Sequence, residues 1–466
     1  MKTIFNIRLI TIVSTALFSL VSIANAAEFN LPKYEKMVLN NGLTIYLMKQ
    51  DEVPLVDVVA IVKAGAVNDN KAGLAQMTAN NLLLGTTSLN RHEFQQKLDF
   101  IGAQTSSSAA LEYSVISASL ASKDIDIVLP ILRDVLRYPA FDQGEFEQQK
   151  SRYLASLERQ KESPRVKVEQ FFNALLYADH AYANTVSGTV DSVKNITLKD
   201  VKGFHETWFS PRNSALIVTG DIDPKAMVKK LKMLFGEWEG EKIVTKVSST
   251  LPIPNKATVL LVNKSDATES TFLIGGPGIK RSNPDFVAVS VINTILGGRF
   301  TSWLNDELRV NSGLTYGARS SFSSNKEGGD FTISTFTRTG TTIDAIDLAL
   351  KTYAKLWDQG IDADTLDSAK SYVKGQFPPR YETSSDIAFL LAEMFVYDFD
   401  EAFINTFTEQ VNKLNVERSK EVIAKYFPKE NMQFVIVGKA DDIREQVKQY
   451  GKLIEVDIKD DTISLD

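Results

Sequence analysis

The chain has 466 residues, of which 44% are hydrophobic and 24% are charged, and its formal net charge is −6. At ~100–200 residues per domain this length predicts about two to four domains, and the composition is that of a soluble globular protein. The acidic balance and the lack of a large basic run argue against nucleic acid or an anionic membrane surface as a partner. Because the sequence contains no cysteine, disulfides, a lipid-modified cysteine, thiol catalysis and cysteine-bound metal are excluded.

The N-terminus has the features of a signal peptide over residues 1–26. Lys2 and Arg8 supply a positive start, a mostly apolar run follows from Leu9 to Ile23, and Ala24-Asn25-Ala26 fits an A-x-A cleavage site. The alternative is a membrane anchor, but the apolar run is short for a span. We therefore expect cleavage after Ala26, which would change the net charge from −6 to about −8, and a periplasmic location.

The first half of the chain mixes strands and helices without strict alternation. A Ser-rich segment at residues 102–112 is expected to be a loop before a strand. Such a mixture predicts an α+β fold with largely antiparallel sheets. The expected strands are 42–50, 55–65 and 112–122, and the expected helices begin near Leu74 and then cover 94–100, 125–137 and 145–161.

A repeat at an offset of 218 residues divides the chain in two. The segment "TWFSPRNSALIVTGDID" (207–223) aligns with "KYFPKENMQFVIVGKAD" (425–441). Each copy reads as a helix ending at an aromatic residue and proline, then an apolar strand, a turn and a second helix. We therefore expect two homologous domains, 33–245 and 259–466, joined by a linker over 246–258 whose Ser, Thr and Pro content suits that role.

Several segments in order resemble the M16 (pitrilysin/insulinase-type) metallopeptidases. They are "NGLTIYL" near the start, "KAGLAQMTANNLLLGT", "AVSVINTILGGRFTSWLNDELR", "SGLTYGARS" and both copies of the repeat. The resemblance extends over nearly the whole mature chain. It implies that the two domains form one half of a clamshell.

The resemblance places an inverted zinc motif, H-x-x-E-H, on the helix that begins near Leu74. Two histidines one turn apart can hold Zn²⁺ from one helix face, and the glutamate takes a proton from metal-bound water. In this chain Gln76, Ala79 and Asn80 stand at those positions, and the third ligand's position falls at Ser156. Amides are poor zinc ligands and alanine accepts no proton. On the second helix, Glu158 or Glu147 could lie nearby, but one carboxylate would not restore a site.

A zinc site elsewhere in the chain has little support. The only histidines are His92, His180 and His205, and no two of them have ligand spacing. We expect each to have a surface or packing role. The sequence therefore predicts no metal and no catalytic residue of its own.

The second half keeps a different pair, Arg309 and Tyr316, within "LNDELRVNSGLTYGARSSF". Arg309 is expected to close a helix from about Ser302, and Tyr316 to begin a strand-like segment. In paired bacterial members of the family that this chain resembles, the subunit without zinc supplies an R-x6-Y pair that faces the partner's metal. A guanidinium fork and a phenol could orient a peptide and stabilise oxyanion charge. There is also a simpler explanation for each residue. Arg309 could stabilise the C-terminal end of its helix through its charge, and Tyr316 could be a half-buried packing residue of a strand.

These features favour an exported non-catalytic subunit of a heterodimeric zinc peptidase. It would bind peptide through Arg309 and Tyr316 and form chamber wall, while a separate M16-type subunit with an intact motif carries the zinc. The alternatives are a peptide-binding or scaffolding protein that takes no part in catalysis, and an autonomous peptidase with unusual ligands.

Overall fold

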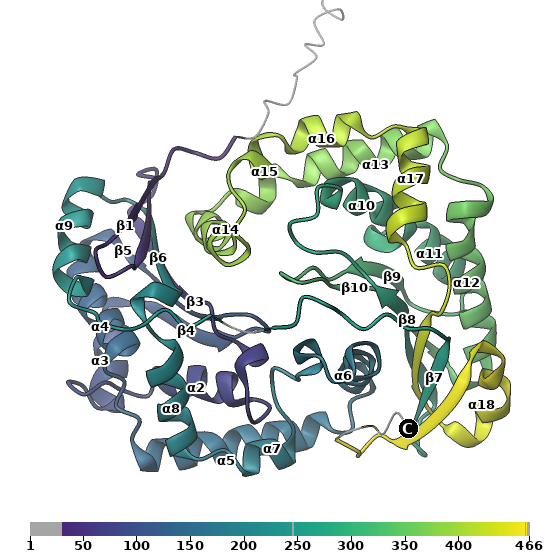
Figure 1. Ribbon diagram of the computed structural model, residues 1–466, viewed down its shortest axis with the longest axis horizontal. Helices are drawn as coiled ribbons and strands as arrows, with labels where there is room; N and C mark the ends of the chain where they lie inside the picture. Colours follow the sequence, from purple (N-terminus) through teal and green to yellow (C-terminus); the bar gives the residue numbers. More distant parts are fainter. Residues whose placement is uncertain (1–29, 245–246, 462, 464–466) are drawn as a thin grey trace, which may run out of the picture.

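The computed structural model describes residues 30–244, 247–461 and 463 (Figure 1). The expected signal peptide at residues 1–26 lies outside this part of the chain. Within it, no helix is long and apolar enough to cross a membrane.

Two six-stranded sheets form the framework, and apart from one edge strand in each sheet their strand orders correspond. The first sheet has the order β1-β2-β6-β3-β5-β4 and the second β12-β7-β11-β8-β10-β9. The strands are β1 (Glu35–Val38), β2 (Thr44–Lys49), β3 (Leu55–Val62), β4 (Gln104–Ala109), β5 (Ser114–Ala121), β6 (Ser214–Gly220), β7 (Thr258–Asn263), β8 (Glu269–Pro277), β9 (Ala318–Phe322), β10 (Asp330–Arg338), β11 (Gln433–Gly438) and β12 (Lys452–Asp457).

Most neighbouring strands run antiparallel, as the sequence predicts. The exceptions among the described strands are β2 with β6, β7 with β11, and β7 with β12. The two halves differ at one edge, since β1 precedes β2 and pairs with it antiparallel, whereas β12 follows the last helix and pairs parallel with β7. The two homologous α+β halves expected from the repeat are confirmed.

The helices follow the same order in both halves. The first half contains α2 (Leu74–Leu82), α3 (Arg91–Ile101), α4 (Ile125–Arg137), α5 (Gln143–Gln160), α6 (Pro164–Tyr177), α7 (Val190–Lys194), α8 (Leu198–Trp208) and α9 (Pro224–Phe235). The second contains α10 (Phe286–Asn293), α11 (Trp303–Asn305), α12 (Thr342–Asp358), α13 (Ala363–Gln376), α14 (Ser384–Tyr397), α15 (Ala402–Asn405), α16 (Phe407–Lys413), α17 (Val416–Tyr426) and α18 (Ala440–Val447). Two π-helical segments, Thr294–Gly298 and Asp306–Asn311, follow α10 and α11.

Local sequence signals explain several helix starts. Asn90 and Glu93 cap each other's backbone at the start of α3, and Thr197 and Asp200 do the same for α8. Such a capping box satisfies two backbone donors that a helix start would otherwise leave unpaired.

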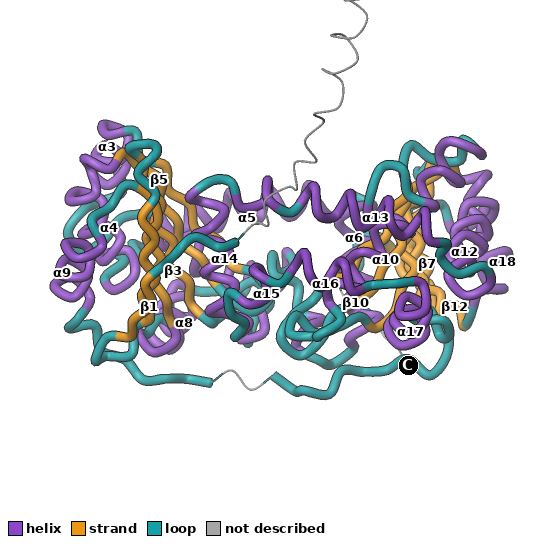
Figure 2. Tube along the Cα trace, turned by 90° about the horizontal axis from the view of Figure 1, so that it is seen from above, coloured by secondary structure: helices purple, strands orange, loops and turns teal. Residues whose placement is uncertain are grey.

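The two halves exchange a helix. Helix α6 of the first half packs on β8 and β11 of the second sheet, and α14 of the second half packs on β3 and β6 of the first. Phe171 and Phe172 of α6 are buried with Leu260 and Val435 of the other half. Figure 2 shows the sheets as two blocks, with α6 and α14 between them and helices such as α4, α9, α12 and α18 on the outer faces. Each sheet is therefore covered by its own helices on one face and by the other half's helix on the opposite face.

One expected loop is a strand. Residues 104–109 form β4, an edge strand paired with β5, whereas the sequence analysis predicts a loop there. The prediction is wrong because small polar side chains suit an exposed sheet edge as well as a loop. The hydroxyl oxygens of Ser106 and Ser117 lie 2.7 Å apart across the two strands.

Candidate functional site

Helix α2 keeps a well-made N-terminus. The carboxylate of Asp69 accepts hydrogen bonds from the backbone N–H groups of Gly73, Leu74 and Ala75 at 2.8, 3.1 and 2.8 Å. Gly73 has a positive φ of 89°, and a side chain there would meet the backbone of Ser187 and Gly188 at 2.9 Å. Burial raises the pKa of Asp69 to about 7 although these donors oppose the shift. The helix is thus fixed in place without any metal.

The face of α2 where the family motif would lie is bonded to the protein itself. The side-chain amide of Gln76 donates to the side-chain oxygen of Asn80 at 2.7 Å, and its oxygen accepts from the backbone N–H of Ala109 at 3.0 Å. Ala79 is fully buried and offers only a methyl group. Gln76 therefore ties α2 to the end of β4 and pairs with Asn80, where two imidazoles would be needed for zinc.

Helix α5 does not supply the missing ligand. Ser156 is half-buried, and its hydroxyl accepts a 3.4 Å hydrogen bond from Gln160. Glu158 is exposed and lies 4.0 Å from Lys194, while Glu147 accepts from Gln143 at 2.9 Å. Both carboxylates thus have surface partners.

The three histidines have the ordinary roles expected of them. His92 is exposed on α3. The buried ring of His180 lies 2.9 Å from the carbonyl oxygen of Ser248 and accepts from the backbone N–H of Tyr182. The buried ring of His205 lies 2.9 Å from the carbonyl oxygen of Leu136, and burial lowers its pKa to about 4.

The residues on this face do not fit a zinc ion. The donor set at the motif positions is two amides, a methyl group and a hydroxyl, and the amides already bond within the protein. Among the described residues, no group of three or more His, Cys, Asp or Glu side chains is arranged to hold a metal. The motif positions of α2 therefore offer neither zinc ligands nor a proton acceptor.

Arg309 lies on the π-helical segment that continues α11, where it is half-buried. Ser302 begins this helical stretch and Asn311 ends it, close to the predicted limits. The guanidinium carbon lies 4.5 Å from the ring centre of Phe300, which is 68% exposed. Among the described residues, no carboxylate lies within ion-pair distance of Arg309; neighbouring Glu307 pairs instead with Lys355 at 2.6 Å. Its donors are available to a ligand.

Tyr316 projects from a loop whose backbone is held firmly. It stands two residues before β9 rather than beginning it, and its side chain is 83% exposed. The hydroxyl of Thr337 donates to the carbonyl of Leu314 at 2.7 Å, and that of Thr335 to the carbonyl of Gly317 at 2.9 Å. The phenol therefore projects into solvent from a loop that is hydrogen-bonded to β10.

Other residues near this pair were not found from the sequence. The ring centres of Tyr316 and Phe336 lie 6.3 Å apart. The guanidinium carbon of Arg165, at the start of α6, lies 4.9 Å from the centre of the Phe336 ring. No sequence pattern could indicate Arg165, because it comes from the first half and reaches the second sheet only through the helix exchange. Tyr316, Phe336 and Arg165 thus form one run of ring and cation contacts, and Arg309 and Phe300 form another.

The comparison with known families decides the relationship. A model described as "Insulinase (Peptidase family M16)" matches residues 45–190, and one described as "Peptidase M16 inactive domain" matches residues 195–373. The chain belongs to the peptidase M16 family. Within that family it lacks the zinc motif, as the residues of α2 show.

Among the M16 proteins similar to this chain, some are named as zinc proteases and another as a non-peptidase homolog. A Helicobacter pylori protein named zinc protease PqqE is 25% identical over 91% of this chain and 97% of its own length. Another H. pylori protein, named non-peptidase homolog YmxG, is 24% identical over 80% of this chain and 86% of its own. A solved "peptidase M16 inactive domain" from Pseudomonas fluorescens has a TM-score of 0.82 and 25% identity, covering 87% of this chain and 98% of its own. The fold of a half-clamshell M16 protein is thereby established.

Proposed function

We propose that this M16 chain is the exported non-catalytic subunit of a heterodimeric zinc peptidase. A partner subunit with an intact motif would carry the zinc, and this chain would add chamber wall and two substrate-binding side chains. One combination of features supports the proposal most strongly. The helix that carries the zinc motif in the family retains its place in the fold with the ligands replaced. Tyr316 is exposed, and the half-buried Arg309 has no carboxylate within ion-pair distance among the described residues.

The two side chains suit recognition of a peptide backbone. A guanidinium presents a planar fork of N–H donors, and a phenol adds one O–H donor. Aimed at a carbonyl of the bound peptide, they would hold it in register and stabilise the negative charge that develops on its oxygen. This chain would perform no proton transfer and no metal chemistry, because the motif positions hold no group for either.

A reconstitution experiment tests the proposal. The purified chain is mixed with an M16 protein that has an intact motif, and hydrolysis of a fluorogenic peptide is followed. The mixture should form a 1:1 complex with activity that neither chain has alone. Arg309→Ala or Tyr316→Phe should lower turnover by ~10²–10³ and ~10-fold or more respectively without disturbing assembly, because an oriented donor is lost.

The matched control is Arg444→Ala on the outer helix α18. Arg444 pairs with Glu455 and Asp441 far from Arg309 and Tyr316 in the sequence and on another helix, so its loss should leave turnover unchanged. Full activity of both Arg309→Ala and Tyr316→Phe would disprove the substrate-binding role. A complex that forms without gaining activity would favour the scaffolding alternative, and chelator-sensitive hydrolysis by the chain alone would favour an autonomous peptidase.

Export to the periplasm is a separate part of the proposal. It rests on the signal-like residues 1–26. The mature protein recovered from a periplasmic extract should begin at Ala27, as determined by N-terminal sequencing or mass spectrometry. A chain that retains Met1 or fractionates with the cytoplasm would contradict it.

A further inference from the structure

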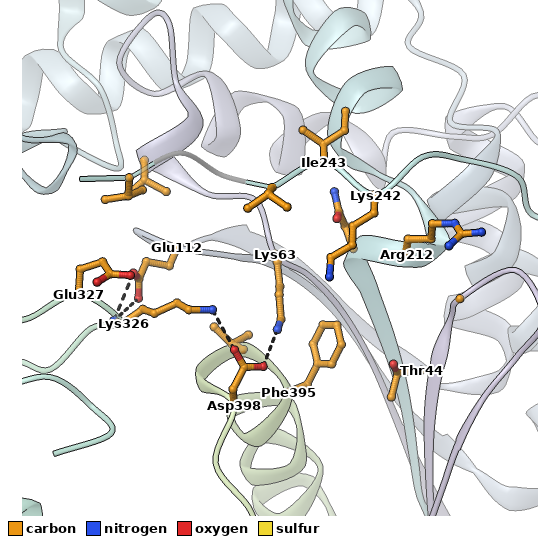
Figure 3. Close-up of a pocket in the computed structure, with 16 residues that line it drawn as sticks. Thr44, Lys63, Glu112, Arg212, Lys242, Ile243, Lys326, Glu327, Phe395 and Asp398 are labelled. Carbon is orange, nitrogen blue, oxygen red and sulfur yellow. Dashed lines mark hydrogen bonds and ion pairs between the residues drawn. The ribbon is translucent and has the colours of Figure 1, made fainter. Parts of the chain in front are cut away.

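A cavity of about 580 Å³ lies at the junction of the two halves, away from both α2 and the Arg309–Tyr316 segment. Its walls come from the end of β3, the end of α14, the turn between β9 and β10, and the segment after α9 (Figure 3). This volume falls within the ~300–1,000 Å³ of typical small-molecule sites.

The acidic groups of this cavity already have donors. Asp398 accepts from Lys63 at 3.0 Å and from Lys326 at 2.9 Å. Glu112 accepts from the hydroxyl of Tyr182 at 2.6 Å and from the backbone of Lys326, and Glu327 pairs with Lys280 at 3.0 Å. These carboxylates therefore have little capacity to attract a cationic ligand.

The basic groups, in contrast, outnumber their partners at one end. Lys63 and Lys326 share the single carboxylate of Asp398, and Lys242 has no carboxylate within 4 Å among the described residues. In Figure 3 the side chain of Lys242 extends toward those of Lys63 and Phe395. Burial lowers the pKa of Lys63, and the nearby ammonium groups of Lys326 and Lys242 lower it further, against the opposing effect of Asp398.

An apolar surface lies beside this positive charge. The ammonium nitrogen of Lys63 lies 4.4 Å from the ring centre of Phe395, and Ile243 and Val396 line the same cavity. Arg212 also lines it, but its guanidinium points away from the two lysines in Figure 3. A ligand with one acidic group and a small hydrophobic body would match both features.

We propose that this cavity binds a small organic anion, with its carboxylate or phosphate between Lys63 and Lys242 and its apolar part against Phe395. Charge-assisted hydrogen bonds to two ammonium groups supply the specificity, and of the two lysines Lys63 is half-buried while Lys242 is exposed at the mouth of the cavity. The binding requires neither the proposed partner subunit nor a peptide, so it stands or fails apart from the proposed function.

Calorimetric titration of the isolated full chain at low salt tests this proposal. The probes are phenyl phosphate, phenylacetate and the uncharged 2-phenylethanol. At least one of the anions should bind saturably at one site per chain, whereas the alcohol should not. The comparison of phosphate with carboxylate shows which acid group the cavity prefers.

Two variants that each lose one positive charge locate the site. Lys242→Ala should weaken binding of the preferred anion about tenfold. Lys229→Ala, on the exposed face of α9, should leave it within twofold. Circular dichroism verifies that both variants fold. Absence of saturable anion binding, or equal affinities for the two variants, would overturn the proposal.

Discussion

His205 shows at the scale of one residue how burial sets chemistry in this protein. Its ring lies edge-on to Phe141 and stacks on Phe209, and its Nε2 lies 2.9 Å from the carbonyl oxygen of Leu136. A positive charge in such a setting is costly, so the native protein holds the ring neutral and its pKa falls to about 4. The unfolded chain would bind a proton there near pH 6.5.

This difference predicts an acid-sensitive stability. As the pH falls from about 6.5 to 4, His205 becomes protonated in the unfolded state but stays neutral in the native state. This difference lowers the free energy of unfolding by up to ~3 kcal/mol. His205→Gln should flatten this part of the profile relative to wild type, since an amide can still donate to Leu136. Urea denaturation at pH 4.5, 5.5 and 7 measures the difference.

The control for this experiment is His92→Gln on the exposed side of α3. Because the side chain is exposed, this replacement should change the free energy of unfolding little. Other buried groups, such as Asp69, also titrate in this range, so the difference between wild type and variant is the informative quantity. Parallel profiles for wild type and His205→Gln would contradict the account.

At the scale of one element, helix α2 keeps its position in the fold although the zinc ligands of the family motif are replaced. Its buried side remains apolar, with Leu74, Met77 and Leu82 almost fully enclosed, and Asp69 and Gly73 fix its start. These features depend on packing against the first half and not on a metal. The backbone that would present a zinc motif is therefore still in position.

A graft tests this conclusion. The variant Gln76→His, Ala79→Glu, Asn80→His and Ser156→Glu should bind one equivalent of zinc, measured by calorimetry and metal analysis, because it restores three ligands with the family's spacing. The same variant without Ser156→Glu should bind at least tenfold more weakly. Equal affinity would show that Glu158 or Glu147 reaches the metal instead.

The sequence predicts much of this element and little of its surroundings. The helix and the loss of its ligands are visible in "GLAQMTANN", because helical spacing assigns Gln76 and Asn80 to one face. The contact of Gln76 with Ala109 is not predictable, since it depends on β4, which reads as a loop. Likewise, Arg309 and Tyr316 follow from the family pattern, but their neighbour Arg165 follows only from tertiary packing.

At the scale of the whole molecule, the sequence repeat correctly predicts two halves but not how they hold together. The sequence analysis expects no helix at either α6 or α14, so the exchange of these two helices is known only from the structure. In the structure Thr219 of β6 donates to the carbonyl of Ser384 at the start of α14, and Tyr177 at the end of α6 donates to Asp330 of β10. The connections between the halves are therefore much more than a linker.

Cutting the linker tests how firmly the halves are joined. A specific protease site inserted between Ser249 and Thr250, which are exposed, would allow cleavage without touching either exchanged helix. The cut protein should elute as one species at the volume of the uncut protein in size-exclusion chromatography, because each fragment retains a helix packed on the other. Separation of the fragments in buffer would contradict this expectation.

A matched variant relates the result to the exchanged helices. Phe172→Ala in α6 removes a fully buried ring and should lower the free energy of unfolding by ~3–5 kcal/mol. After cleavage, this variant should dissociate at a lower urea concentration than the parent. Equal midpoints would show that α6 contributes little to the association of the halves.

The reciprocal placement of α6 and α14 has the geometry of a domain-swapped dimer contained in one polypeptide. Equivalent segments of two equivalent units occupy each other's sheets, as in swapped homodimers. In a single repeat unit, one face of the sheet would be exposed to water, and the helix equivalent to α6 or α14 would have no sheet to pack against. Such a unit should fold only as a pair, so this architecture is consistent with duplication and fusion of a gene whose product was an obligate twofold dimer.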